Sequence, residues 1–234
     1  MRTKNISLLI IFLFLLFLSI LYFFTFEKSF EERPIFDSPD RNNYYSFAMN
    51  YLENNNLFFT PPNLSREDIK IAFTPRDAAY FNGKIVFRGF LGAIFFYITI
   101  FSLSTNLVYF INIIFSILIL ISLFLFLRYI FNIKTATIGI IILGLFPIYW
   151  YYSSILLIID IPFLFFYLFS FYYFFKFLDI KSKRCFILFS IFCAVSISWR
   201  YDKILFYFPF LLIFLFYEKN RIFIYLLKFC RKKL

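Results

Sequence analysis

The residues Asp160–Phe175 read DIPFLFFYLFSFYYFF, a carboxylate and a proline followed by an uncharged, mostly aromatic run. A second uncharged run, Tyr149–Ile159, precedes Asp160. A helix needs about 20 apolar residues to cross the hydrocarbon core of a bilayer, which is about 30 Å thick. The two runs therefore predict membrane-spanning helices that meet near Asp160 at a membrane surface.

The same pattern recurs along the chain. Further apolar stretches lie at residues 6–26, 90–104, 107–127, 135–152, 155–175, 185–199 and 204–217. Of the 234 residues, 62% are hydrophobic and 16% are charged, whereas a soluble domain has about 25% charged residues. This composition excludes a water-soluble globular fold and predicts an all-α fold, a polytopic membrane helical bundle. The absence of histidine excludes His-based catalytic triads and HExxH zinc sites.

The polar and basic residues divide the chain into five parts. We expect a signal-anchor helix over 1–26, an outer loop over 27–88 with a juxtamembrane helix at about 39–54, a helix over 89–106 that is re-entrant or lies in the outer leaflet, a five-span bundle over 107–217, and a basic cytoplasmic tail over 218–234. The helix over 89–106 is not expected to cross, because its apolar part is short and is followed by the polar run Ser102–Asn106.

The formal net charge of +11 is interpreted as an orientation signal. Lysine and arginine in short loops favour the cytoplasm, so Arg2 and Lys4 predict a cytoplasmic N-terminus and an outer loop outside the cell. Later basic clusters fall on the cytoplasmic side: Arg128/Lys134, Lys176/Lys181/Lys183/Arg184, Lys219/Arg221 and Lys228/Arg231/Lys232/Lys233. The expected location is the plasma membrane, with several crossings. Nucleic acid is not an expected partner, because no solvated basic segment carries polar base-reading residues.

The outer loop contains a helix-start pattern. Ser38 suits the cap, Pro39 the first helical position and Asp40 the first turn. A single face then carries Tyr44, Ala48, Tyr51 and Leu52, which predicts an amphipathic helix lying on the membrane surface. Asp40 either complements the helix dipole or belongs to a functional site.

Charged side chains are expected to gather on the outer face. They are the carboxylates Asp40 and Asp160 and the cations Lys84, Arg88, Arg200 and Lys203. A lone carboxylate at mid-bilayer costs about 2.5–3.5 kcal/mol, so Asp160 is either functional or an interfacial turn acid before Pro162. Carboxylates suit general-base work or a divalent cation such as Mg²⁺ or Mn²⁺, and cations suit a phosphate leaving group. A substrate that reaches such a site through the membrane would be a lipid-linked phosphate. The local alternative for Arg200, Asp202 and Lys203 is a surface ion pair.

This layout resembles the GT-C glycosyltransferases that use polyprenyl-phosphate sugars, such as the protein mannosyltransferases and the aminoarabinose transferases. Asp40, Tyr44 and Ala48 match the family pattern D-E-x-x-Y-x-x-x-A, with Arg41 in place of the second acid. Three further matches follow the same order along the chain: Gly83-Lys84…Arg88-Gly89, Ser153/Ser154…Asp160-Ile161-Pro162, and Arg200 at the start of a later span.

The resemblance implies roles for these residues. Asp40 would be the catalytic base or a metal-linked acid, and Asp160 the second acid of the site. Arg88 and Arg200 would contact the lipid phosphate, and Lys84 and Tyr44 would join them in binding substrate. The donor would be a polyprenyl-phosphate-linked sugar, and the acceptor a protein, a lipid or a glycan. The chain has fewer spans than the eight to thirteen usual in the family, so it would be a minimal member, one half of a pair in which a second subunit supplies the missing spans, or an inactive remnant.

Two other functions fit the composition. A transporter or lipid flippase should show Gly- or Pro-broken, repeated spans with ionisable residues near the midplane, whereas the charges of this chain lie at the ends of the apolar runs. A truncated, non-catalytic membrane remnant is the third alternative, for which the missing acid at position 41 is the argument.

Overall fold

The computed structural model describes residues 11–25, 39–60, 78–104, 107–155 and 158–219. The remaining parts of the expected signal anchor, outer loop and basic tail lie outside the described residues. The helices are Ile11–Thr25, α2 (Pro39–Asn54), α4 (Leu91–Leu103), α5 (Val108–Ile130), α6 (Ile133–Gly144), α7 (Pro147–Ser153), α8 (Asp160–Ile180), α9 (Lys183–Trp199), the 3₁₀ helix η2 (Tyr201–Tyr207) and α10 (Phe208–Lys219). The strands are β1 (Phe58–Phe59), β2 (Ala78–Phe81) and β3 (Lys84–Phe87).

The long helices form a bundle in which α5 and α8 run parallel. Ring contacts join Phe115 to Phe165 at 5.5 Å and Phe126 to Phe175 at 5.7 Å between centroids. An early residue of α5 thus contacts an early residue of α8 and a late residue contacts a late one, as in parallel helices. Helix α9 returns antiparallel to α8, because its first turns contact the end of α8 and Trp199 lies 6.3 Å from Phe166 near the start of α8. The predicted all-α membrane bundle is thereby confirmed.

Two described helices are long and apolar enough to cross a bilayer, Phe110–Ile130 and Asp160–Ile180. The expected span over 135–152 is instead two helices, α6 and α7, bent by 67° at a short break. Pro147 begins α7, and Phe146 before it has an extended backbone, because a residue preceding proline is disfavoured in the helical conformation. Helix α4 has 13 residues and rises only about 20 Å. The five-span count and the position of α4 relative to the bilayer stay predictions.

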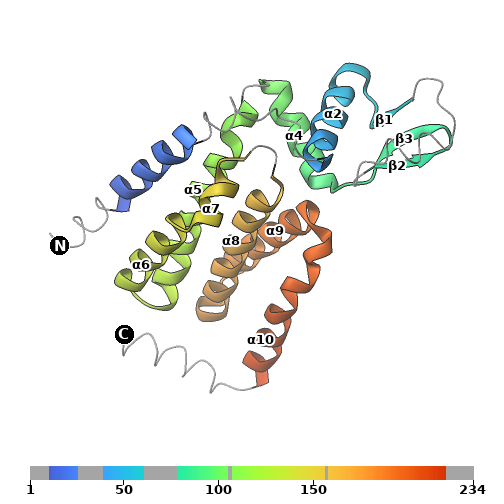
Figure 1. Ribbon diagram of the computed structural model, residues 1–234. Coiled ribbons are helices and arrows are strands. Elements are labelled where there is room, and N and C mark those ends of the chain that lie inside the picture. The colour runs from blue at the N-terminus through green and yellow to red at the C-terminus, as the bar shows by residue number, and fades with distance from the viewer. Residues whose placement is uncertain (1–10, 26–38, 61–77, 105–106, 156–157, 220–234) are drawn as a thin grey trace.

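The outer loop contains a small antiparallel sheet that the sequence analysis did not predict. Its strand order is β1-β3-β2, and β2 and β3 form a hairpin with Phe81 opposite Lys84. The two turn residues, Asn82 and Gly83, both have positive φ, 48° and 78°, as a type I′ hairpin turn requires. Figure 1 shows α2, α4 and this sheet grouped at one end of the long helices.

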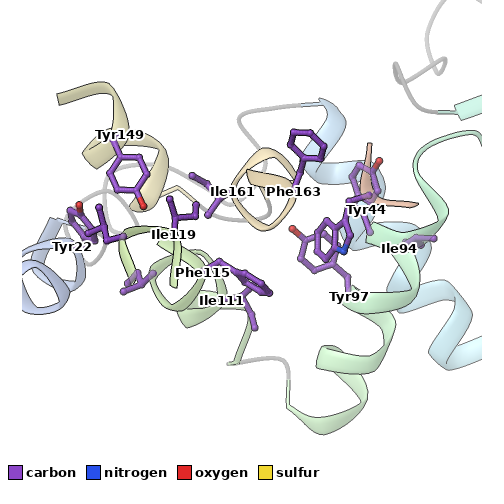
Figure 2. Close-up of a cluster of buried hydrophobic side chains, with 14 of the residues drawn as sticks. Tyr22, Tyr44, Ile94, Tyr97, Ile111, Phe115, Ile119, Tyr149, Ile161 and Phe163 are labelled. Atoms are coloured by element: carbon purple, nitrogen blue, oxygen red, sulfur yellow. The ribbon is translucent and has the colours of Figure 1, made fainter. Parts of the chain in front are cut away.

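Helix α2 buries its apolar face against the chain itself. The side chains of Tyr44, Phe47 and Ala48 are buried, and the Tyr44 ring meets Phe87 of the sheet and Tyr97 of α4 edge to face. The face that was expected to lie on the membrane surface is therefore covered by α4 and the sheet. Tyr44 and Tyr97 are among the buried side chains drawn in Figure 2.

At the other side of the bundle, helix Ile11–Thr25 packs against the bent pair. The Tyr22 hydroxyl donates to the carbonyl of Gly144 at 2.8 Å, and the Tyr149 hydroxyl donates to the carbonyl of Ser116 at 2.6 Å. Both tyrosine side chains are buried, and their rings lie side by side in Figure 2. Tyr22 thus provides a hydrogen-bond donor for the carbonyl oxygen of Gly144, the last residue of α6, which lies at the break in the helix.

Candidate functional site

The candidate site lies where α8 begins and α9 ends, because these helices run antiparallel. Asp160 is the first residue of α8 and Arg200 directly follows α9. Their side chains form a salt bridge of 2.8 Å between Arg200 Nη1 and Asp160 Oδ1. Two residues that are 40 positions apart in the sequence, and were expected to gather on one face, therefore belong to one cluster.

Lys203 contributes a second cation to Asp160. Its Nζ lies 2.5 Å from the same oxygen, Asp160 Oδ1, and 5.1 Å from the ring centroid of Phe163. The Asp160 side chain is 48% exposed, whereas Lys203 is 25% and Arg200 18% exposed. The carboxylate is thus open to an approaching ligand while both cations are packed against the protein.

Asp202 pairs with the edge of the Arg200 guanidinium that Asp160 does not contact. Its two carboxylate oxygens accept hydrogen bonds from Arg200 Nε at 2.9 Å and Arg200 Nη2 at 2.7 Å, the bidentate geometry that guanidinium and carboxylate favour. These bonds raise the pKa of Arg200 and lower the pKa of the Asp202 carboxyl below its ordinary value. Both shifts favour the charged forms of Arg200 and Asp202 at neutral pH.

Phe90 joins the outer loop to this cluster. Its ring lies 4.9 Å from the guanidinium carbon of Arg200 and 4.9 Å from the ring of Tyr201. Its backbone N–H donates to the Tyr44 hydroxyl at 3.0 Å, so α2 and Arg200 are both tied to one residue. A Cβ on Gly89 would lie 2.7 Å from that hydroxyl, which explains why a glycine precedes Phe90.

No hydrogen bond or ion pair joins the described side chains of Lys84 and Arg88 to the four-charge cluster. Asp40 is in the first turn of α2, one turn before Tyr44, and its side chain lies outside the described residues. Lys84 is at the hairpin turn, with its Nζ 3.9 Å from the ring centroid of Phe58. Arg88 is exposed in the connection to α4 and forms no ion pair with the described residues. Of the six predicted site residues, the structure brings together Asp160, Arg200 and, through Phe90, Tyr44.

The described part of the chain contains no group of three metal-ligating side chains. Asp160 shares its Oδ1 with two cations, so this carboxylate alone does not fit a divalent cation. Asp40, the other expected ligand, has no described side chain, and the divalent cation stays a prediction.

The opposite end of the bundle is basic. There the Tyr129 hydroxyl of α5 donates to Asp179 Oδ2 of α8 at 2.8 Å. The surrounding cations at the ends of α5, α6, α8 and α9 are Arg128, Lys134, Lys176, Lys181, Lys183 and Arg184. Since α8 has 21 residues, the two ends are about 30 Å apart, the thickness of a bilayer core.

The fold and the charged cluster thus define a membrane protein with a polar site at one end of its bundle. Residues 88–229, more than half of the chain, match the family model described as dolichyl-phosphate-mannose-protein mannosyltransferase. The chain belongs to this family and is a membrane glycosyltransferase of the GT-C type, which confirms the resemblance inferred from its motifs. No curated protein and no solved structure matches it.

The matched segment contains Asp160 and Arg200 but begins after Asp40 and Tyr44. The match identifies the family, and the roles of the individual site residues stay predictions. Sequence reasoning missed Phe90, for which no motif gives a signal. It named Asp202 only as a local ion-pair partner, which is what the spacing of two residues from Arg200 indicates.

Proposed function

We propose that this glycosyltransferase moves a sugar from a polyprenyl-phosphate-linked donor to an acceptor at the end of the bundle that carries Asp160 and Arg200. The observation that carries the proposal is the cluster of two partly exposed carboxylates, Asp160 and Asp202, and two packed cations, Arg200 and Lys203, at that end. A phosphate that enters from the membrane meets Arg200 and Lys203 where α8 begins and α9 ends. Cations fixed at this position stabilise the charge of a phosphate leaving group.

In the proposed reaction, a hydroxyl oxygen of the acceptor attacks the anomeric carbon of the donor sugar. Its proton passes to a carboxylate, for which Asp40 is the candidate because Tyr44, one turn later in α2, contacts Phe90 beside Arg200. The bond between the anomeric carbon and the phosphate oxygen breaks, and its electron pair leaves with the polyprenyl phosphate. Arg200 and Lys203 offset the added negative charge, Asp160 orients both cations, and Arg88 and Lys84 are expected to extend the binding surface.

The proposed orientation places this end outside the cell and the N-terminus in the cytoplasm of a multi-pass plasma-membrane protein. It is supported by the cations around Asp179 at the opposite end, because short cytoplasmic loops are enriched in lysine and arginine. The acceptor is then an extracytoplasmic protein, lipid or glycan.

The test is donor protection of the full-length protein in nanodiscs. We expect polyprenyl-phosphate mannose to raise the thermal unfolding temperature and GDP-mannose, which lacks the lipid, to leave it unchanged. Asp160→Asn and Arg200→Gln should lose this protection. The matched controls Asp179→Asn and Arg128→Gln, at the opposite end, should keep it.

Equal protection of Asp160→Asn, Arg200→Gln and the unaltered protein would refute the proposed site. The flippase alternative predicts movement of polyprenyl phosphate across vesicles without sugar transfer. The break between α6 and α7 resembles the discontinuous helices of transporters, but residues 144–147 at that break carry no charge, so the observation does not favour transport.

A further inference from the structure

We propose that Asp202 is an internal occupant of the phosphate position on Arg200, and that a donor phosphate must displace it to bind. The proposal rests on the proposed function, because it assumes that Arg200 receives the phosphate of the lipid-linked donor. It adds a residue that opposes donor binding, whereas Asp160, Arg200 and Lys203 support it.

Each of the three guanidinium nitrogens of Arg200 already donates a hydrogen bond to a carboxylate. Its Nε and Nη2 donate to Asp202, and its Nη1 donates to Asp160. One face of the guanidinium is covered by the Phe90 ring at 4.9 Å. A phosphate that binds the Nε and Nη2 edge of the guanidinium therefore competes with Asp202 for the same two N–H groups.

Asp202, and not Asp160, is the carboxylate that a phosphate would displace from Arg200. Asp160 is held by both Lys203 and Arg200, whereas Asp202 forms ion pairs with Arg200 alone among the described residues. The Asp202 side chain is 44% exposed, so it can turn outward into solvent. A phosphate can bind the same edge of a guanidinium with two of its oxygens, as the Asp202 carboxylate does.

The charges of the cluster also favour displacement of Asp202 by an anion. The formal charges of Asp160, Asp202, Arg200 and Lys203 sum to zero, so the closed cluster does not attract an anion over distance. With Asp202 turned away, two cations face one carboxylate and one positive charge is left for the phosphate. Asp202 thus keeps the cations paired when no donor is bound, and unpaired charge in a half-buried position is costly.

The backbone of η2 supports this movement. Asp202 lies in a seven-residue 3₁₀ helix between α9 and α10, in which Lys203 departs from helical geometry with φ −96° and ψ 16°. Runs of 3₁₀ helix longer than three or four residues are uncommon and have poorer hydrogen bonds. Asp202 therefore lies in a segment whose backbone hydrogen bonds are weaker than those of α8 and α9.

The test measures binding of farnesyl phosphate, a short polyprenyl monophosphate, to the full-length protein in nanodiscs, with farnesol as the lipid-only control. An exposed ion pair is worth up to about 1 kcal/mol, so Asp202→Asn should bind farnesyl phosphate up to about fivefold more tightly. Asp202→Ser should behave in the same way. Farnesol binding should not change in either variant.

Arg200→Gln distinguishes the proposed phosphate contact of Arg200 from the proposed displacement of Asp202. We expect it to weaken farnesyl phosphate binding, and we expect Asp202→Asn to have no further effect when combined with it. If Arg200→Gln binds as the unaltered protein does, the proposed phosphate contact fails. If Arg200→Gln weakens binding but Asp202→Asn and Asp202→Ser bind no more tightly, the displacement by phosphate is refuted while the proposed function stands.

Discussion

Replacing Gly92 with alanine should separate α4 from α9 and so test how the outer loop is docked on the bundle. A Cβ at position 92 would lie 2.3 Å from Ser198 Oγ and 2.7 Å from both the carbonyl carbon and the carbonyl oxygen of Ser198. Favourable contacts between such atoms are about 3.5–4.0 Å. The Ser198 side chain can rotate away, but its backbone cannot, so the two helices must move apart.

The size of the effect follows from two opposing contributions. Overpacking of this kind costs about 1–3 kcal/mol, and alanine in place of a helical glycine returns about 0.5–1 kcal/mol. Because the clash is with backbone atoms, the overpacking cost falls in the upper part of its range, about 2–3 kcal/mol. The net loss is then about 1–2.5 kcal/mol, which for a chain of this size lowers the unfolding temperature by about 2–10 °C. Because α4 begins one residue after Phe90, the movement should also shift the Phe90 ring from Arg200 and weaken donor protection.

The matched control is Gly139→Ala in α6. The Cβ added there meets only the flexible side chain of Leu127, with its methyl carbon Cδ1 at 2.4 Å, and this side chain can turn. We expect Gly139→Ala to unfold at or above the temperature of the unaltered protein, measured by thermal unfolding in nanodiscs. The double variant Gly92→Ala/Ser198→Ala should not recover full stability, because the backbone contact remains. Full recovery, or an unchanged unfolding temperature for Gly92→Ala, would refute the reasoning.

Three further outcomes are expected. Trp199→Ala should cost about 3–5 kcal/mol in unfolding free energy, because its ring is 2% exposed and packs among four aromatic rings; a loss below 1 kcal/mol in chemical unfolding would contradict this packing. Tyr44→Phe should cost about 0.5–1.5 kcal/mol and weaken donor protection, since the hydroxyl accepts from Phe90 N–H; unchanged stability and protection would contradict the link. The lowered pKa of Asp202 means that its pairing with Arg200 stabilises the protein above its ordinary pKa of 3.8 and is lost as the pH falls further. The difference in unfolding temperature between Asp202→Asn and the unaltered protein, measured from pH 6 down to pH 2, should therefore shrink below pH 3.8, and a difference that grows as the pH falls would contradict the sign.

The bundle and half of its site could be predicted from sequence because both depend on where charges interrupt apolar runs. Asp160 and Arg200 each lie at the end of a long apolar run, so antiparallel helices bring them to one end. The hairpin also has a local signal, the Asn82-Gly83 turn. The face of α2 was assigned to the membrane because sequence periodicity marks an apolar face but not the partner that covers it.

The contact between Phe90 and Arg200 could not be predicted, because nothing in the sequence distinguishes Phe90 from the other 41 of the 42 phenylalanines. The contact depends on the close approach of α4 and α9, which Gly92 permits. The distance between two helices is set by packing across the interface, and no spacing within one segment encodes it. The same holds for Lys203, whose contact with Asp160 requires η2 to turn back toward α8.

Asp160 shows that a local structural role and a site role are compatible in one residue. As the first residue of α8 it places a negative charge at a helix N-terminus, which the helix dipole favours. That role would be met by any acid in the first turn and requires no partner from another helix. The structure adds two cations on a single oxygen, from residues 40 and 43 positions later in the chain. A turn acid before Pro162 explains the charge but not its partners, so the cluster with Arg200 and Lys203 is the feature that requires a functional explanation.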